Sequence, residues 1–341
     1  MRRTGQTRLT ISNSSPQSAP PHPLRGYLFI ASAAFLWGVS AALGRAVFTG
    51  KLRLGATPFR PIDPLILSQT RTTFSLLMLL PLLVASQGWQ RIKLPARDLA
   101  YCFLLGTLGV AVSNYFYYVA IQRTNVATAI IVQYTAPVWV LFYVVARGQQ
   151  KLSLQKVVAV ALAVAGIALV IGIVGTKPGE GRALHLDSYG LIAALLASFS
   201  FAFYNVAGHR ILARYDRWRV LVWTLTAAAA FWLVVNPPWK ILAAHYAPAQ
   251  WLFLFIFSMI SVLGAFSLYF LGLQYLEPTR AIIASCLEPV FSILLAAVLL
   301  GEVLHSVQTV GIVFVLAAIV IVQRPGRPGV GEETVAVDPI E

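Results

Sequence analysis

Ten long apolar stretches dominate this 341-residue chain and leave few folds open to it. Hydrophobic residues make up 58% of the sequence and charged residues 11%, whereas soluble domains are about half apolar and a quarter charged. Most stretches approach the ~20 residues that a helix needs to cross ~30 Å of hydrocarbon. They are continuously apolar rather than alternating, which predicts helices and not a β-barrel. The expected helices are residues 26–48, 64–86, 99–121, 126–145, 154–174, 188–212, 220–235, 251–273, 279–300 and 307–322.

One apolar segment occurs twice. Residues 110–138 align without a gap on residues 262–290, 152 positions later, and 8 of the 29 paired positions are identical. Five helices per half is an odd number, so the second copy enters the membrane from the opposite side. We therefore predict an all-α integral membrane protein with ten transmembrane helices in two inverted five-helix repeats, residues 26–174 and 188–322, as in many secondary transporters.

The formal charge of +14 reports topology rather than a nucleic-acid partner. With the N-terminus inside, 17 of the 26 Lys and Arg residues fall on the cytoplasmic side, as the positive-inside rule expects. Lys51, Arg53 and Arg60 in the first outer loop run against this orientation. We predict a multi-pass protein of the plasma (inner) membrane with both termini cytoplasmic.

Both ends of the chain read as tails. Residues 1–24 are rich in Ser, Pro and Arg and are expected to be a disordered cytoplasmic tail, and residues 324–341 a polar cytoplasmic tail. An organelle transit peptide has a composition similar to that of the first tail and stays open as an alternative.

Short motifs in both halves resemble one transporter family. They are Trp37-Gly38, Phe203-Tyr204, His209-Arg210, Leu287-Glu288-Pro289-Val290, Leu300-Gly301-Glu302, Gln308 and Gly311. Over about residues 26–322 the chain resembles the EamA-type members of the drug/metabolite transporter superfamily. The resemblance implies ten helices, cytoplasmic termini and export of small metabolites such as amino acids. The first half departs from the pattern, because Gly148-Gln149 stands where the second half has Gly301-Glu302.

Polar and aromatic side chains inside the apolar stretches are candidates for a substrate pathway, because polar groups in lipid must face protein or water. An aromatic cage with a few amide and hydroxyl groups suits an organic solute better than an inorganic ion. Packing in the core is the alternative interpretation for each aromatic residue. The expected pathway residues are Trp37, Asn114, Tyr117, Tyr118, Gln133, Tyr134, Tyr204, Asn205, Tyr269 and Ser285.

Four further residues have a suggested role. Glu288 is the only acid well inside an apolar stretch; it either couples transport to protons or contacts a substrate amine, or it fixes its helix beside Pro289. Pro137 and Pro289 occupy equivalent places in the two halves, where we expect gating kinks, with static kinks as the alternative. Arg71, about 10 Å into its helix, either snorkels to the outer surface or contacts an anion in the outer vestibule.

These patterns favour a secondary transporter that exports small organic metabolites by alternating access. An intramembrane enzyme and ATP-driven transport are disfavoured, because no zinc-protease, serine-hydrolase or Walker motif is found. A non-catalytic channel is the other alternative, although a channel needs no inverted duplication. No cofactor or metal is expected. The expected partners are a small organic solute, the lipid bilayer and, as a candidate coupling ion, protons.

Small residues suggest close helix contacts. Ala161, Ala165, Ala168 and Gly172 have small-xxx-small spacing, and Ala227 to Ala230 thin another helix. The contacts are expected within the chain, with a homodimer as the alternative.

Overall fold

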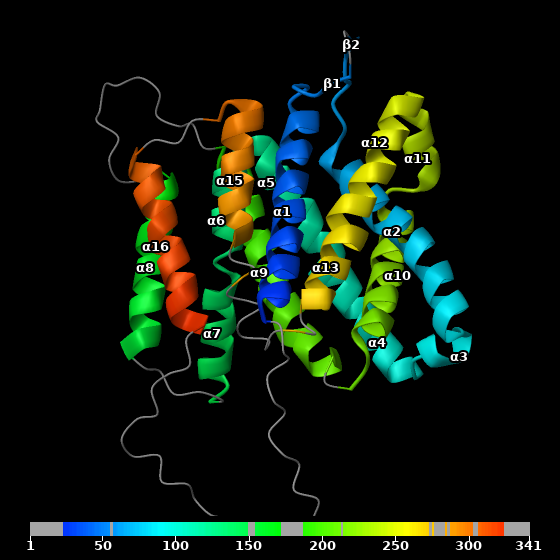
Figure 1. Cartoon of the computed structure of the whole chain (residues 1–341), viewed down its shortest axis with the longest axis horizontal. Helices are drawn as coiled ribbons and strands as arrows, with labels where there is room; N and C mark the ends of the chain where they lie inside the picture. Colours follow the sequence, from blue (N-terminus) through cyan, green and yellow to red (C-terminus); the bar gives the residue numbers. More distant parts are fainter. Residues whose placement is uncertain are drawn as a thin grey trace, which may run out of the picture.

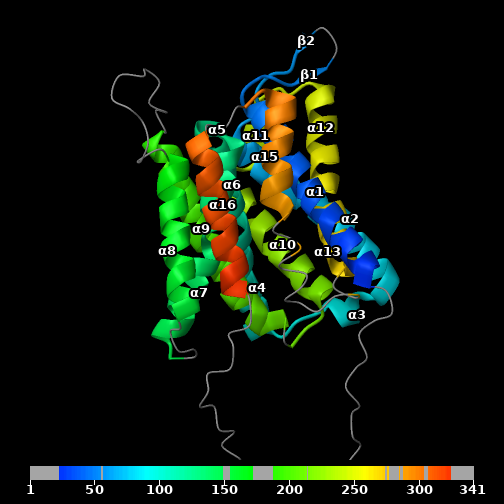
Figure 2. The same ribbon diagram turned by 60° about the vertical axis from the view of Figure 1, so that its left-hand side comes forward.

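The chain folds into a bundle of helices (Figure 1, Figure 2). The computed structural model describes residues 23–54, 57–148, 154–171, 187–212, 214–272, 275, 284, 287–302 and 306–323. The strands among them form a single antiparallel hairpin, β1 (Arg53–Leu54) with β2 (Thr57–Pro58), in the loop after α1 (Pro23–Phe48). The described part of the chain is therefore almost entirely helical, as predicted.

Within the described ranges, six helical segments are long and apolar enough to cross a bilayer. Four are single helices: α1, α2 (Pro64–Gln87), α9 (Ser188–Leu212) and α10 (Arg217–Val235). Two are composite: α4 (Ala96–Leu104) with η1 (Leu105–Ala111) and α5 (Val112–Arg123), and α12 (Pro248–Ser258) with η2 (Met259–Gly264) and α13 (Ala265–Gly272). The remaining helices are α3 (Trp89–Ile92), α6 (Val126–Gln133), α7 (Ala136–Ala146), α8 (Leu154–Ile171), α11 (Pro238–Ala243), α15 (Leu287–Leu300) and α16 (Ser306–Gln323).

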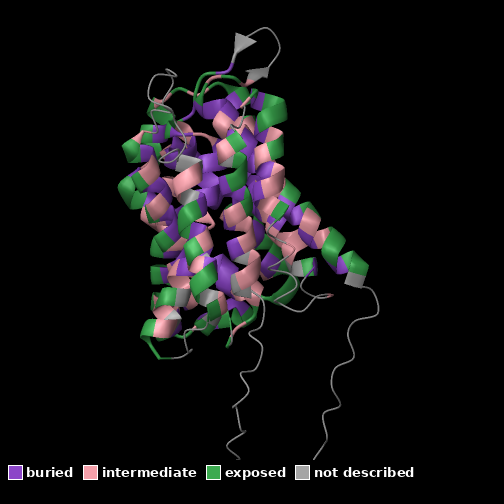
Figure 3. Ribbon diagram, turned by 90° about the vertical axis from the view of Figure 1, so that its left-hand side faces the viewer, coloured by how far each residue is buried: buried purple, intermediate pink, exposed green. Residues whose placement is uncertain are grey.

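Lipid-facing character is visible in how burial is distributed. Figure 3 shows buried residues inside the bundle and exposed residues on its outside. Large apolar side chains such as Val234 and Val298 are each 80% exposed or more. Soluble proteins rarely present so many apolar side chains to water. The arrangement agrees with a multi-pass membrane protein.

Two π-helical segments interrupt the composite helices, and the sequence patterns did not predict them. Shifting the sequence by 152 positions places η2 on residues 107–112, which overlap η1. π-Helical turns widen a helix and occur often at functional sites. The same irregularity therefore stands at equivalent places of the two halves.

The single helix expected over residues 126–145 is wrong, because the chain breaks between α6 and α7. Pro137 lacks the N–H that would bond to the carbonyl one turn earlier, so a regular helix cannot continue through this point. Thr135 closes the break instead: its N–H and its hydroxyl both donate to the carbonyl of Val132, at 3.1 and 2.6 Å. The expected kink is a full interruption. In the second half, α15 begins two residues before Pro289, and most residues that precede it lie outside the described part.

The long contact between α8 and α16 is made by other small residues than expected (Figure 2). Ala161 and Ala165 are exposed, and Gly172 lies outside the described residues, whereas Ala159 and Ala163 are buried. A Cβ on Gly166 would lie 2.7 Å from the Gly311 carbonyl oxygen. The stripe expected for this contact is therefore rotated around the helix. The prediction for α10 is confirmed, because Ala227 is buried and a Cβ on Gly106 of η1 would lie 2.7 Å from it.

Candidate functional site

A buried polar cluster forms around Arg71. Its Nη1 donates hydrogen bonds to Asn114 Oδ1 at 3.1 Å and to Tyr118 Oη at 2.8 Å. Its Nη2 donates to the carbonyl oxygen of Ser261 at 3.0 Å, and its guanidinium carbon lies 5.6 Å from the centre of the Tyr118 ring. The cluster joins α2 and α5 of the first half to η2 of the second.

The Arg71 side chain does not snorkel to the membrane surface, because the residue is only 8% exposed. Its Nε has no hydrogen-bond partner among the described residues, and the buried hydroxyls of Tyr117 and Ser261 also have none there. Each unsatisfied buried polar group costs about 1–3 kcal/mol. Such a concentration of unpaired groups is typical of a functional site rather than of a packing core.

Arg71 belongs to a polar stretch of α2 whose other members the sequence analysis left without a role. Ser68, Thr70 and Thr72 are buried and donate their hydroxyls back to carbonyls of the same helix. Gln69 and Asn236 exchange two hydrogen bonds, of 2.9 and 2.8 Å, between α2 and the end of α10. These neighbours of Arg71 are therefore satisfied by hydrogen bonds within the described residues.

Glu288 contacts the break between α6 and α7 in the first half. Tyr134, in the break, donates its hydroxyl to Glu288 Oε2 at 2.7 Å. Glu288 is half-buried in the first turn of α15, where the helix dipole favours a carboxylate, and Pro289 beside it is buried. This bond joins two regions that the 152-residue repeat makes equivalent.

Arg71 bonds to the other half of the chain through the Ser261 carbonyl, and Glu288 does so through the Tyr134 hydroxyl. The ion pairs formed between described residues include neither Arg71 nor Glu288. The interface between the halves thus holds a basic and an acidic side chain that are not bonded to each other. Such a site is suited to a polar solute or to a moving proton.

An aromatic group stands between α1 and α13. The Trp37 ring lies 5.3 Å from Phe266, edge to face, and 5.7 Å from Tyr269. The structure therefore brings Trp37 and Tyr269 together, from the first and the second half of the chain.

The other expected pathway residues do not join the Arg71 cluster through a contact seen in the structure. Gln133 is half-buried at the end of α6, and Tyr204 packs over Gly109 of η1. Asn205 is exposed, and its amide donates to the Phe201 carbonyl of its own helix at 2.7 Å. Ser285 and the side chain of Pro137 lie outside what the structure describes.

Glu302 was not predicted as a site residue, but its carboxylate closes one end of the interface between the halves. Arg45 Nε donates to Glu302 Oε1 at 2.9 Å, and the backbone N–H of Val126 donates to Oε2 at 3.2 Å. Arg45 Nη1 also donates to the carbonyls of Ile121 and Gln122, both at 2.7 Å. The ends of α1, α5 and α15 and the start of α6 are thereby tied together.

A second ion pair joins the halves at the loop between α9 and α10. Arg214 Nη2 lies 2.9 Å from Asp98 Oδ1, and the Tyr215 hydroxyl donates to Oδ2 at 2.6 Å. The hydrogen bond to the Asp98 carboxylate raises the pKa of Tyr215. Inter-half ion pairs are therefore present both at the end of α1 and at the start of α4.

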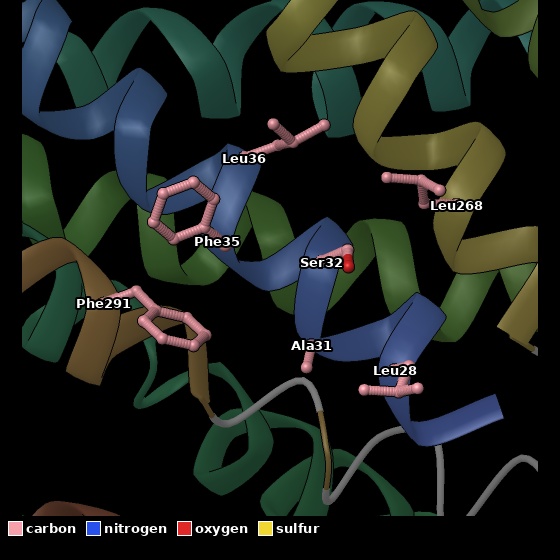
Figure 4. Close-up of a pocket in the computed structure, with 7 residues that line it drawn as sticks. All are labelled: Leu28, Ala31, Ser32, Phe35, Leu36, Leu268 and Phe291. Atoms are coloured by element: carbon pink, nitrogen blue, oxygen red, sulfur yellow. The ribbon is translucent and has the colours of Figure 1, made fainter. Parts of the chain in front are cut away.

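A hollow of about 280 Å³ lies between α1, α13 and α15, and no residue of the Arg71 cluster lines it (Figure 4). Its walls are apolar, with Phe35, Leu268 and Phe291 among them, and Ser32 supplies its only side-chain hydroxyl. Such walls suit a lipid chain better than a polar solute. Among the described residues, no group of three or more His, Cys, Asp or Glu is placed to hold a metal ion.

Comparison with known proteins gives a consistent result. The model of the EamA-like transporter family matches residues 24–172 and again residues 188–324. An uncharacterized inner membrane transporter of Salmonella typhimurium, YicL, is 23% identical over 306 residues, which cover 89% of this chain and 96% of that protein. An uncharacterized transporter of Archaeoglobus fulgidus is 26% identical over 64% of this chain and 76% of its own length.

The fold also has a counterpart among solved structures. One crystal structure superposes with a TM-score of 0.56 at 18% sequence identity, covering 88% of this chain and 97% of that one. At this identity the likeness concerns the fold alone. Together with the two family matches, which span most of the sequence, these findings show that the chain belongs to the EamA-like transporter family of the drug/metabolite transporter superfamily.

Proposed function

We propose that the protein is a secondary transporter that exports small organic metabolites, amino acids among them, by alternating access between two inverted five-helix repeats. The observation that carries this proposal is the hydrogen bond from Tyr134 to Glu288. It places an ionisable group at the helix break, between the two halves of the chain. In transporters with inverted repeats, substrate and coupling-ion sites lie at such discontinuous helices near mid-membrane.

Several repeat-related features support the inverted arrangement of ten helices. Besides η1 and η2, the short helices α3 and α11 follow α2 and α10. Gly148 after α7 and Gly301 after α15 both have positive φ, 68° and 66°, which ends a helix in the left-handed conformation. Asp98 and Gln250, 152 positions apart, each start a helix and each contact the loop that follows the first long helix of the other half.

Alternating access requires that each end of the inter-half interface opens in turn. The Arg45–Glu302 network closes one end, and the Asp98–Arg214 pair bridges the halves at the other. With cytoplasmic termini, the Arg45–Glu302 end faces outward. Opening to the outside then requires that this network breaks, while the solute stays at the centre.

Glu288 is the residue to which we assign proton coupling. A carboxyl that alternates between an occluded and a hydrated surrounding can load a proton on one side and release it on the other. The Tyr134 hydroxyl gives the charged form a partner while the site is closed.

The test is export from cells. Cells that express the wild-type chain and cells that express Glu288→Gln are loaded with ¹⁴C-labelled amino acids, and the label that they retain is followed over time. We expect faster loss of at least one amino acid from wild-type cells than from cells with an empty vector. Asp187→Asn, which changes a peripheral carboxylate paired with Arg123, is the matched control and should behave as wild type. Equal retention of all solutes by wild-type and empty-vector cells would contradict export of amino acids.

A further inference from the structure

Among the described residues, the guanidinium of Arg71 is not fully hydrogen-bonded. An arginine side chain carries five N–H donors. Asn114 and Tyr118 take both hydrogens of Nη1, Ser261 takes one hydrogen of Nη2, and Nε has no partner among the described residues. Two donors therefore remain, the Nε–H and one N–H of Nη2. The two nitrogens, Nε and Nη2, form one side of the planar group.

The charge of Arg71 is not neutralised by its bonded partners. An amide oxygen, a phenol oxygen and a backbone carbonyl accept its hydrogen bonds, and all three are neutral. The ion pairs formed between described residues do not include Arg71. Buried arginines are normally paired with an anion, because an isolated buried charge is expensive. Among the described residues, the guanidinium is thus held by neutral groups, and the carboxyl of Glu288 is bonded to Tyr134 instead.

Two hydroxyls extend the donor set. The Tyr117 and Ser261 side-chain oxygens are buried and have no hydrogen-bond partner among the described residues. The Tyr117 ring lies 5.4 Å from the ring of Tyr118, which is bonded to Arg71, and Ser261 is in direct contact with Arg71 through its carbonyl. Both hydroxyls can donate to an acceptor that approaches the guanidinium.

We propose that the transported solute carries a carboxylate, and that Arg71 holds it through two parallel hydrogen bonds from its Nε and Nη2 edge, with the hydroxyls of Tyr117 and Ser261 as further donors. The spacing of the two N–H groups matches the two carboxylate oxygens, and charge-assisted pairs of this kind are strong. The inference rests on the proposed function, because it assigns a class of solute to the same central site.

The orientation of the guanidinium matters as much as its charge. Asn114, Tyr118 and Ser261 fix its plane from three sides. A lysine at this position would keep the charge but would lose the two-pronged edge. Both Arg71→Gln and Arg71→Lys should therefore lose recognition of a carboxylate, and Arg71→Lys tests whether charge alone is enough.

The first experiment measures preference for the acid over its amide. Purified wild type, Arg71→Gln and Arg71→Lys are placed in liposomes, and uptake of each ¹⁴C-labelled amino acid is inhibited with the unlabelled acid or its carboxamide. For wild type we expect the acid to inhibit uptake at a concentration roughly tenfold lower, or less, than the amide requires. In both Arg71 variants, the acid and its amide should inhibit uptake equally. Arg123→Gln, which changes an exposed ion pair, should keep the wild-type preference for the acid.

A binding measurement separates this inference from the transport proposal. The unfolding temperature of the purified proteins in detergent is recorded with amino acids, their carboxamides or inorganic phosphate. Stabilisation of wild type by amino acids only, lost in Arg71→Gln, supports the carboxylate site even if no transport is seen. Transport with an unchanged acid preference in Arg71→Gln contradicts the inference and leaves the function standing. Stabilisation by phosphate alone, or by none of the three, overturns the carboxylate assignment.

Discussion

Arg45 and Glu302 form an ion pair of 2.9 Å between the end of α1 and the residue that follows Gly301. Both side chains are 18% exposed, so the pair is partly shielded from water. Glu302 also accepts the N–H of Val126 at the start of α6, a group that has no partner within its own helix. One carboxylate thus connects three helix ends across the two halves.

Glu302→Gln is expected to lower the free energy of unfolding by about 1–3 kcal/mol, because it leaves the partly buried Arg45 without its anionic partner. The check is a double-mutant cycle with Arg45→Gln, read from unfolding in detergent. The same cycle on Arg123 and Asp187, an exposed pair of 3.3 Å, should give about 0–1 kcal/mol. Equal coupling energies in the two cycles would show that the Arg45–Glu302 pair does not hold the two halves together more strongly than an exposed ion pair does.

Gly106→Ala should reduce the amount of folded protein. The added Cβ would meet the Thr224 carbonyl oxygen and would lie 2.7 Å from the Ala227 Cβ, so η1 and α10 would have to move apart. Overpacking of this kind costs typically about 1–3 kcal/mol. Gly208→Ala is the control, because its Cβ meets nothing within 4 Å. The measurement is the yield of monodisperse protein on size-exclusion chromatography, and equal yields would show that the two helices are not tightly held at this crossing.

Tyr134→Phe should alter the pH dependence of transport while leaving the protein folded. The change removes the hydroxyl that donates to Glu288 and keeps the ring. Hydrogen bonds to charged groups contribute about 1.5–3 kcal/mol, enough to change how readily the carboxyl exchanges a proton. Tyr189→Phe, at an exposed tyrosine of α9, serves as the control. A pH profile identical to that of wild type would mean that the Tyr134 bond does not act on the transport step.

Both termini should lie in the cytoplasm. The prediction comes from the 17 basic residues on that side, and the structure adds that α1 begins and α16 ends at the same end of the bundle (Figure 1). Reporter domains fused to each terminus give the answer directly. An external signal from the C-terminal fusion would reverse the assignment of the Arg45–Glu302 end to the outside.

The apolar pattern predicted helix positions well because burial in lipid depends on composition over about 20 residues. The helix expected at residues 188–212 has those bounds in the structure, and the one expected at 64–86 ends one residue later. The π-helical turns were missed, because they leave the composition unchanged, and Pro137 predicted a kink but not the interruption between α6 and α7. The face of α8 that packs against α16 was also predicted wrongly, since the spacing of small residues does not determine which side of a helix contacts its neighbour.

The candidate site was predicted in part. Arg71, Asn114 and Tyr118 were chosen because polar groups are costly in lipid, and the structure brings these three together. Sequence alone could not show that Arg71 bonds to the other two, because the contact between α2 and α5 depends on the tertiary structure. Glu302 was passed over because it stands at a helix end, where an acid is usually solvated; its partner Arg45 is 257 residues away.

Transport driven by a pH gradient in liposomes tests whether Glu288 couples transport to protons. Purified wild type and Glu288→Gln are reconstituted in equal amounts of inserted protein, and uptake of ¹⁴C-labelled amino acids is measured with and without an imposed gradient. We expect the gradient to drive uptake by wild type. Glu288→Gln keeps the shape of the side chain but cannot titrate, so it should transport without responding to the gradient. A response of Glu288→Gln equal to that of wild type, or no transport by wild type, would contradict this expectation.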